Sequence, residues 1–353
     1  MESDQSHDRR MEQAADYQTY TARGTHEEIG RTTALRGKTL LLAGERMDEE
    51  KRDYARRCRE VVGKAYPPLL EEFAGYTAAL GLPEDAALFH YSLGVVGACS
   101  AVAVRTPQGM RVARNYDYFY WENRRHLIRT LPECGYAHIG MHEGLVGGRF
   151  DGLNEHGLFV NFNGAGAHPE RAEPGISFHL IVRVLLETCR TAEEAANLLL
   201  KLPIIEPKSY MLVDPREAFV AEVHPERREI RGMQEGVLAM TNHFIHPAMS
   251  AYNPPWDNSV ARYDRLVAGA KRLRDAEEGD PLERLGELMA DHEAPLCGHV
   301  DGLSTFWSCV ADPERRDIRY SLGAPCRNRY RGYGGIEDDD GVLEPHTEDD
   351  RLH

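Results

Sequence analysis

The chain has 353 residues, of which 42% are hydrophobic, so it can bury the core of one large domain or two small ones. Its formal net charge of −15 argues against a nucleic-acid partner, because binding to phosphates requires a basic surface. The cysteines number 7, an odd count without paired spacing, which is typical of reduced thiols rather than of a disulfide framework. We therefore expect a cytoplasmic protein.

Both ends of the chain are polar. Residues 1–20 lack the apolar core of a signal peptide or of a transmembrane helix, so we expect a disordered N-terminus and no membrane partner. Residues 334–353 contain runs of Asp and Glu, which indicate an acidic disordered tail. Two regions lie between them, a helical segment over 21–98 and a larger region over 99–333.

Helical periodicity is clearest in three parts of the chain. From about 47 to 80 the apolar residues recur at helical spacing among Arg and Glu. A second helical stretch covers about 177–200, and its later half begins with a capping box formed by Thr191 and Glu194. A third covers about 259–275. The stretch from about 47 to 80 predicts that the segment before residue 98 is mainly helical.

Segments typical of strands separate these helices. They lie near residues 134–147, 157–163, 209–223, 228–240, 305–312 and 316–322. Helices and mostly antiparallel strands thus come in blocks along the chain. This order predicts an α+β protein in which helices pack on sheets.

The segment from Cys99 to Asp117 is predicted to be a hairpin with a reactive thiol at its start. Two apolar runs, 102–104 and 110–113, flank a turn at 107–109. Pairing these runs brings residues 114–117 back beside Cys99. A cation near a thiol favours the thiolate, and a carboxylate can orient a proton acceptor. The alternative is that Cys99 is a small apolar strand residue beside a surface loop.

Several motifs in addition to this hairpin resemble one enzyme family. They are Gly24-Thr25-His26-Glu27-Glu28-Ile29-Gly30, the runs 152–163, 241–244 and 257–262, and Leu296-Cys297-Gly298-His299. In this order they are similar to peptidase family C45, the acyl-coenzyme A:6-aminopenicillanate acyltransferase-like branch of the choloylglycine hydrolase and penicillin acylase superfamily of N-terminal nucleophile (Ntn) hydrolases. The resemblance implies a four-layer αββα Ntn-hydrolase sandwich with a helical N-terminal segment.

The resemblance also implies an autocatalytic cut before the nucleophile. The cut would fall between Ala98 and Cys99, and the freed α-amine would act as base for the thiol of its own residue. An α-amine has a pKa near 8, so it is close to neutral at working pH without help. Asp117 would orient the amine, and Arg114 would favour the thiolate. The alternatives are that Asp117 merely closes the hairpin and that Arg114 forms a surface salt bridge.

A tetrahedral oxyanion needs preorganised neutral donors. By resemblance, the side chain of Asn242 supplies one donor, and the backbone N–H at or near Asn163 supplies the other. Asn161 and Asn163 are two positions apart and share a face of their strand, which leaves open which of them lines the oxyanion hole. Asn242 could instead cap its own turn.

Four positions are expected to contact substrate, and two positions depart from the family pattern. The substrate-binding set is Arg262, Asn161, Tyr116 and His243, although Arg262 could equally be solvated on a charged helix. Relatives usually have Gly where this chain has Ala98, and an Arg where it has Gly298. Arg262 or Arg114 replaces that Arg, or the acyl group recognised is different.

We interpret the chain as an autoprocessed cysteine Ntn amidohydrolase that cleaves a linear amide C–N bond of a small molecule through a thioester on Cys99. The alternative is an acyltransferase that passes the acyl group to an amine. A more remote alternative is a noncatalytic binding protein, which would be expected to lose Cys99 or Asp117.

No metal or cofactor is expected for this chemistry, while a coenzyme A thioester stays open as co-substrate. A set of His and Cys residues matches no standard zinc spacing; it comprises His243, His246, His292, Cys297 and His299. The cleaved fragments are expected to form a heterodimer, and further homo-oligomerisation is left open. The partner is a small-molecule amide or acyl donor.

Overall fold

The computed structural model describes residues 16–37, 47–94, 98–119, 124–169, 172–254, 256–276, 278–298 and 303–334. Their strands form two sheets. In spatial order the larger sheet consists of β1 (Asp16–Gly24), β4 (Arg124–Pro132), β5 (His138–His142), β6 (Asp151–Asn154), β7 (Phe159–Gly164), β8 (Lys208–Val213), β9 (Ala218–Val223) and β10 (Arg228–Gly232). The smaller sheet consists of β11 (Val237–Met240), β2 (Ala98–Thr106), β3 (Gly109–Phe119), β12 (Leu303–Asp312), β13 (Asp317–Ser321) and β14 (Arg331–Gly332).

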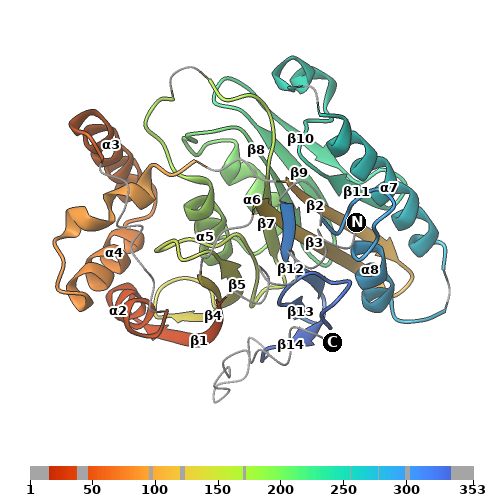
Figure 1. Ribbon diagram of the computed structural model, residues 1–353, viewed down its shortest axis with the longest axis horizontal. Helices are drawn as coiled ribbons and strands as arrows, with labels where there is room; N and C mark the ends of the chain where they lie inside the picture. Colours follow the sequence, from red (N-terminus) through yellow and green to blue (C-terminus); the bar gives the residue numbers. More distant parts are fainter. Residues whose placement is uncertain are drawn as a thin grey trace, which may run out of the picture.

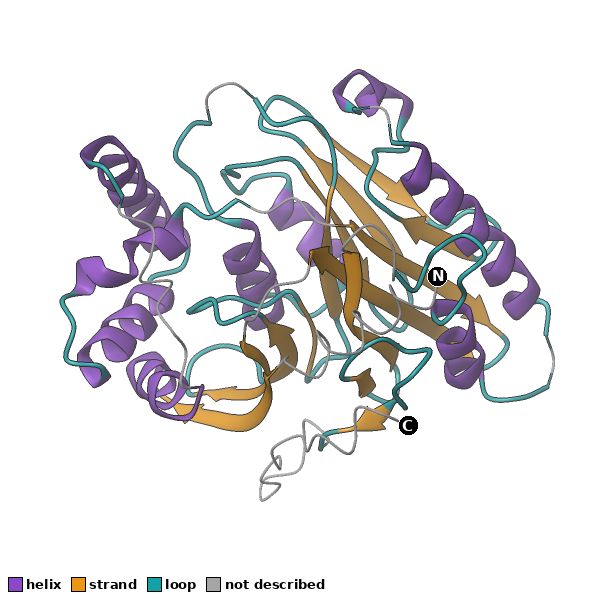
Figure 2. Ribbon diagram, viewed as in Figure 1, coloured by secondary structure: helices purple, strands orange, loops and turns teal. Residues whose placement is uncertain are grey.

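Helices cover the outer face of each sheet, as Figures 1 and 2 show. The larger sheet carries α5 (Phe178–Thr188) and α6 (Ala192–Leu199), and the smaller sheet carries α7 (Asp257–Arg274) and α8 (Pro281–Met289). A short 3₁₀ helix, η2 (Pro247–Tyr252), precedes α7. The order helix, sheet, sheet, helix is the predicted four-layer αββα sandwich. Among the described residues, no helix is long and apolar enough to cross a membrane.

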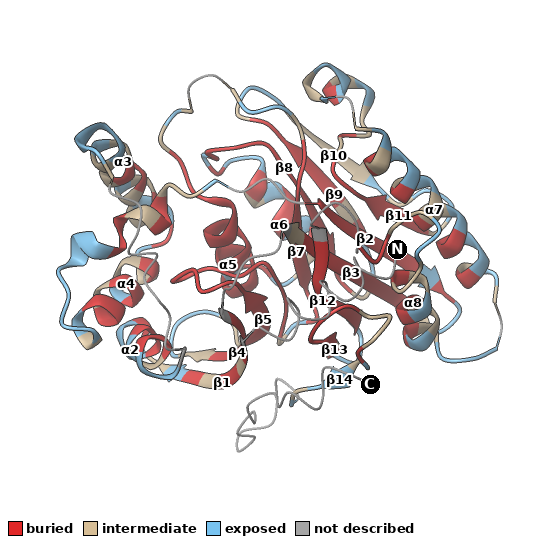
Figure 3. Ribbon diagram, in the orientation of Figure 1, coloured by how far each residue is buried: buried red, intermediate tan, exposed pale blue. Residues whose placement is uncertain are grey.

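The space between the sheets is the main core, and it contains the nucleophile candidate. Along β2, Cys99, Ala101 and Ala103 belong to this core, whereas Val102 and Val104 pack in a second core beneath α7 and α8. This division follows from the two-residue period of a strand. Both faces of β2 are therefore buried, and Figure 3 shows the central strands in the colour of buried residues.

The N-terminal segment contains α2 (His26–Gly37), α3 (Glu49–Ala65), α4 (Pro68–Ala79) and the 3₁₀ helix η1 (Glu84–Tyr91). It is attached to α5 by buried polar contacts. Glu72 of α4 pairs with Arg183 at 2.8 Å, and Glu187 pairs with His26 at 3.0 Å. Because unpaired buried charges are costly, these contacts favour a segment that stays docked on the core.

The opening glycine motif has a structural role. Thr25 and Glu28 form a reciprocal cap, with Glu28 N–H donating to Thr25 Oγ1 at 3.2 Å and Thr25 N–H donating to Glu28 Oε2 at 2.8 Å. A Cβ at Gly30 would lie 1.9 Å from the carbonyl oxygen of Glu72, and one at Gly75 would lie 2.0 Å from that of Glu27. The backbones of α2 and α4 thus meet at two glycines.

Several element predictions need correction. Residues 16–20, expected to be disordered, form the first half of β1, which pairs in parallel with β4 and buries Tyr17 and Tyr20. The helix expected over 47–80 is two helices, because Pro67 and Pro68 separate α3 from α4. The helices near 177–200 and 259–275 are confirmed. Residues 1–15 and 335–353 lie outside the described residues, so disorder there stays a prediction.

Candidate active site

The predicted hairpin is confirmed, and its register fixes where each side chain lies. Cys99 on β2 pairs with Tyr116 on β3, and Ala98 pairs with Asp117. Alternation along β3 therefore places Arg114 and Tyr116 on the same face as Cys99. Asp117 projects from the opposite face, toward α7 and the chain that follows α8. The cation and the carboxylate thus approach Cys99 from two sides of one sheet.

The main chain of Cys99 is held at both of its polar atoms. Its backbone N–H donates to Asn242 Oδ1 at 2.9 Å, and its carbonyl oxygen accepts from Arg262 Nη1 at 2.7 Å. The same Nη1 donates to Ser100 Oγ at 2.9 Å, and Arg262 Nη2 donates to Asn242 Oδ1 at 2.7 Å. Arg262 is buried, so the alternative of a solvated arginine is wrong.

Asn242 is itself fixed by the surrounding backbone and by α7. Its backbone N–H donates to Ser259 Oγ at 2.8 Å, and its Nδ2 donates to the carbonyl oxygen of Gly164 at 2.8 Å. Two donors converge on Oδ1, which establishes the orientation of the amide. The Nδ2 group is therefore engaged with the backbone of β7 in the uncut chain, and by resemblance this amide would also donate to an oxyanion. That role stays a prediction.

Asp117 lies in a short chain of hydrogen bonds behind the hairpin. Thr305 Oγ1 donates to Asp117 Oδ1 at 2.5 Å and accepts from the backbone N–H of Gly298 at 2.9 Å. A Cβ at Gly298 would lie 3.8 Å from the carboxyl carbon of Asp117, so a side chain at this position would start beside this carboxylate. Burial lowers the pKa of Arg262, and the negative charge of Asp117 opposes this effect. Arg262 is thus a cation already close to Asp117.

Arg114 is buried between the sheets and does not form a surface salt bridge. It pairs with Asp151 of β6, and its Nη2 donates to the carbonyl oxygen of Phe162 at 3.1 Å. Asp151 also accepts from Trp307 Nε1 at 2.7 Å and from the Tyr320 hydroxyl at 2.9 Å. The charge of Arg114 is therefore neutralised across the two sheets.

The thiol of Cys99 is not a thiolate in the uncut chain. Burial raises its pKa to about 11, the charge of Arg114 lowers it, and the charge of Asp117 raises it again. A hydrogen bond with the backbone of Asp117 lowers it further. Because desolvation is the largest effect, the thiol keeps its proton in this state, while the charge of Arg114 acts in the predicted direction and its role in catalysis stays a prediction. The thiol therefore needs a base.

The two asparagines of β7 do share a face, as predicted. Asn161 Nδ2 donates to Asn163 Oδ1 at 3.2 Å, and Asn163 Nδ2 donates to the carbonyl oxygens of Met240 and Thr241 at 3.3 and 3.2 Å. Asn163 thus ties β7 to the end of β11, just before Asn242. The part played by the Asn163 backbone N–H in an oxyanion hole stays a prediction.

The remaining expected substrate contacts already have protein partners. The Tyr116 hydroxyl donates to Glu143 Oε2 at 3.0 Å, and its ring stacks on Trp307 with centroids 4.0 Å apart. His243 Nδ1 lies 2.7 Å from Ser259 Oγ. Tyr116 is part of the core next to the nucleophile, and His243 belongs to the contacts that hold Asn242 through Ser259. Their contact with substrate stays a prediction.

Three supporting residues were missed from the sequence, namely Asp151, Ser259 and Thr305. Asp151 directly precedes the motif that begins at Gly152, and Ser259 lies inside the 257–262 motif. Thr305 lies beside the apolar pair Phe306 and Trp307 in a strand that also contains Ser304 and Ser308. A buried polar residue at a strand position is the signal that could have identified Asp151 and Thr305.

Comparisons with known proteins bear on the family and the fold of the chain. The model of the family described as acyl-coenzyme A:6-aminopenicillanic acid acyl-transferase matches residues 104–327, a region that begins just after Cys99. No curated protein matches the chain in sequence.

A variant of conjugated bile acid hydrolase from Clostridium perfringens has a TM-score of 0.53 and 14% identity, covering 72% of this chain and 98% of that chain. Another mutant of the same enzyme has a TM-score of 0.52 and 13% identity, covering 71% and 97%. Penicillin V acylase from Agrobacterium tumefaciens has a TM-score of 0.46 and 15% identity, covering 71% and 98%. At such identities the first two establish a shared fold. Because the family match spans more than half of the sequence, the chain belongs to the acyl-coenzyme A:6-aminopenicillanic acid acyltransferase family of Ntn-type enzymes.

Proposed function

We propose that this chain is an autoprocessed cysteine Ntn amidohydrolase that cleaves a linear amide C–N bond of a small molecule through a thioester on Cys99. The observation that carries the proposal is the hydrogen bond from the backbone N–H of Cys99 to Asn242 Oδ1 at 2.9 Å. A cut before Cys99 converts this nitrogen into an α-amine. Asn242 already offers the acceptor that would hold that amine beside the thiol.

Processing begins with the thiol of Cys99. Its sulfur adds to the carbonyl carbon of Ala98, the peptide C–N bond breaks, and the nitrogen of Cys99 takes up a proton. Water then hydrolyses the resulting thioester, which leaves a carboxylate on Ala98 and frees the thiol. Arg262 Nη1 holds the carbonyl oxygen of Cys99 at 2.7 Å and so fixes the residue during this exchange.

Turnover of a substrate uses the new amine as base. Because burial raises the pKa of the thiol to about 11, the thiol keeps its proton at neutral pH unless a base removes it. The α-amine, with an ordinary pKa near 8, is suited to this role. The sulfur then attacks the substrate carbonyl, the amine product leaves with a proton, and water releases the acid.

The oxyanion formed in that attack is stabilised by neutral donors. These are the side-chain amide of Asn242 and the backbone N–H at or near Asn163. Both belong to elements that are fixed by other hydrogen bonds, Asn242 through Gly164 and Asn163 through Met240 and Thr241. Donors that are already fixed stabilise the transition state without reorganisation.

Acyl transfer to an amine is the second candidate, and the description of the matching family favours it. The same residues would form the thioester in both reactions. The outcome depends on how well the pocket excludes water and positions an amine. We prefer hydrolysis because Gly298 stands where relatives often have an arginine, which weakens the case for the acyl donors of that family.

The proposal is tested by trapping the acyl group. Processed protein is mixed with acyl anilides of varied chain length, quenched with acid and digested for mass spectrometry. We expect the acyl mass on the peptide that begins with Cys99 and none in Cys99→Ala. Cys189→Ala, which removes a buried cysteine at the end of α5, should acylate normally. Acylation of another residue, or none under conditions of turnover, contradicts the proposal.

Rising concentrations of amine acceptors then separate the two reactions. Hydrolysis predicts that free acid stays the main product. Amide formation that saturates with acceptor and suppresses acid release identifies a transferase instead.

A further inference from the structure

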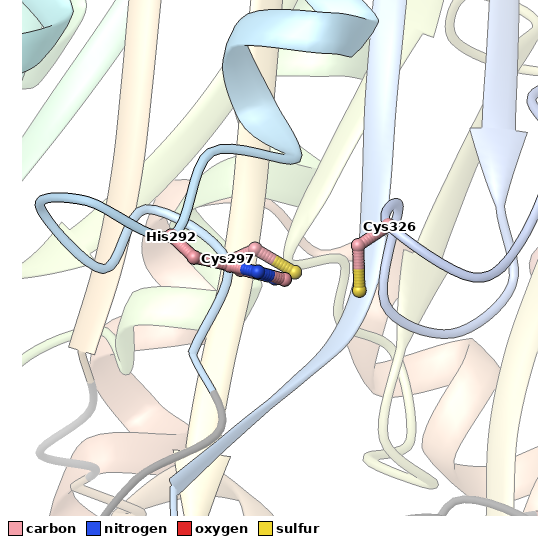
Figure 4. A group of neighbouring side chains, drawn as sticks. All are labelled: His292, Cys297 and Cys326. Carbon is pink, nitrogen blue, oxygen red and sulfur yellow. The ribbon is translucent and has the colours of Figure 1, made fainter.

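His292, Cys297 and Cys326 form a cluster outside the hydrogen-bonded set that surrounds Cys99 (Figure 4). One imidazole nitrogen and the two sulfur atoms all lie within 4.8 Å of one another. Cys297 is buried, Cys326 is partly exposed, and His292 lies at the surface. The cluster therefore has one side toward the core and one side open to solvent.

The backbone on both sides of this cluster is fixed by other contacts. The side chain of Asn115 on β3 donates to the carbonyl oxygen of Leu296 at 2.7 Å, and Cys297 N–H donates to the carbonyl oxygen of Asp291 at 3.0 Å. On the other side, Asn328 N–H donates to the carbonyl oxygen of Ala324 at 3.1 Å, which closes a turn around Cys326. Backbone contacts of the fold thus hold the two cysteines near each other, and their side chains also form a hydrogen bond.

The donor set selects a class of metal. Two thiolates and an imidazole are ligands of Zn²⁺, whereas Mg²⁺ and Ca²⁺ prefer oxygen. In a tetrahedral zinc site the bond lengths of about 2.3 Å to sulfur and about 2.0 Å to nitrogen place ligand atoms roughly 3.5 Å apart. The three ligand atoms lie within 4.8 Å of one another. The side chains therefore need only a small inward movement to reach the spacing of a zinc site. The exposed position of His292 supplies an entry path.

We propose that His292, Cys297 and Cys326 bind a zinc ion, with water in the fourth position. The ion ties the segment after α8 to the turn after β13. Each cysteine loses its proton to solvent as the metal binds. Gly298 follows Cys297 directly, and its N–H donates to Thr305, which in turn donates to Asp117. The ion therefore steadies the segment behind Asp117 and takes no part in the reaction.

Cobalt provides the first test, because thiolate ligands give Co²⁺ an intense charge-transfer absorption. The full chain is purified in reductant, stripped with a chelator and titrated with Co²⁺ and then with Zn²⁺. We expect the thiolate absorption to appear with Co²⁺, to saturate at one ion per chain, and to disappear when Zn²⁺ displaces cobalt. Zinc should also raise the Tm of the wild-type chain.

Single substitutions assign the site. Cys326→Ser and His292→Asn should each weaken binding by about 100-fold or more and remove the rise in Tm, while circular dichroism in the absence of metal stays unchanged. Cys134→Ser is the matched control, because it removes an exposed cysteine from a different part of the chain and should bind like the wild type.

Three outcomes would overturn the proposal. They are the absence of thiolate absorption in reduced wild-type protein, undiminished binding by Cys326→Ser, and recovery of Cys297 and Cys326 as a disulfide from protein that binds no metal after reduction. None of these measurements uses substrate or processing. Failure of the zinc proposal therefore leaves the proposed amidohydrolase function untouched. Failure of the amidohydrolase proposal likewise leaves the zinc site untouched.

Discussion

The side-chain oxygen of Asn242 accepts the backbone N–H of Cys99 at 2.9 Å, although the two residues are 143 positions apart. Arg262 donates to the same oxygen at 2.7 Å, so the acceptor is polarised and fixed. In the uncut chain this contact holds a peptide nitrogen. In the proposed processed chain it would hold the α-amine that serves as base, and under the same proposal Asn242 would also donate to the oxyanion.

Two substitutions of Asn242 separate these roles. Asn242→Ala removes both groups and should lower turnover by about 10²–10³, besides slowing processing. Asn242→Asp keeps the acceptor for Cys99 and removes the Nδ2 donor, so processing should persist while turnover falls. Fragment formation on gels and kcat on an acyl anilide give the two readouts. Full turnover in a well-folded Asn242→Asp would remove Nδ2 from the oxyanion hole.

Asp117 is expected to serve processing and turnover alike, because the proposed mechanism has it orient the same residue in both. Asp117→Asn should impair both reactions. Thr305→Val tests the support behind it, since it leaves the N–H of Gly298 without its acceptor and Asp117 Oδ1 without its donor. A cost of about 1–3 kcal/mol is typical of such a change, and where it falls on the positioning of Asp117 it corresponds to roughly 5- to 150-fold in kcat.

Thr305→Ser restores the hydroxyl and is the matched control for the valine variant. It should recover most of the lost kcat with KM unchanged. If the serine variant is as slow as the valine variant, the effect belongs to packing, and the positioning role of Thr305 is wrong.

The buried pair of Arg114 and Asp151 is predicted to be important for stability. Asp151→Asn leaves the fully buried charge of Arg114 without its counter-ion and should lower the free energy of unfolding by about 3–5 kcal/mol. Urea unfolding provides the measurement. Glu27→Gln, which breaks an exposed pair with Arg31, should change it by less than about 1 kcal/mol. Equal effects of the two substitutions would show that Arg114 is solvated.

Buried histidines predict a loss of stability in acid. Burial lowers the pKa of His90 to about 4 and holds those of His138, His142 and His179 well below the ordinary value. A histidine with a depressed pKa adds to the free energy of unfolding. This contribution is complete above pH 6.5, the ordinary pKa of histidine, and is lost as the pH falls toward 4.

Between pH 6.5 and 4, each such histidine should lower the free energy of unfolding by about 1.4 kcal/mol for each pH unit. Urea unfolding at several pH values measures the slope, and His90→Phe should make it shallower by about one proton. His156, which lies at the surface, provides the control in His156→Gln. A slope that His90→Phe does not change would show that His90 is already protonated in the folded chain.

The fold could be predicted where the pattern is local. The β2 and β3 hairpin has its turn and both apolar runs within twenty residues, and α5, α6 and α7 have clear helical periodicity. β4 was missed because Arg125, His126 and Arg129 are buried, and polar residues on the buried face conceal the alternation of a strand. β1 was missed because its partner is β4, whose residues lie about a hundred positions away.

The candidate site likewise contains residues that a local pattern places and residues that it does not. Cys99, Arg114 and Asp117 could be placed together from the hairpin register, whereas Asn242 and Arg262 came only from a family resemblance. The state of the thiol could not be predicted, because burial outweighs the charge of Arg114 and burial is a property of the whole fold. His292 and Cys297 belong to the His and Cys set that the sequence offers, but Cys326 could not be joined to them because about thirty positions separate it from Cys297.

The intact mass of the purified chain tests the central claim most directly, since Cys99 must become an N-terminal residue. The account predicts that the 39.8 kDa chain yields two fragments, residues 1–98 and 99–353, which stay together because buried contacts such as Glu72 with Arg183 join them. Cys99→Ala should stay whole, and Cys189→Ala should be cut. An active preparation in which Cys99 never carries a free α-amine would contradict the account.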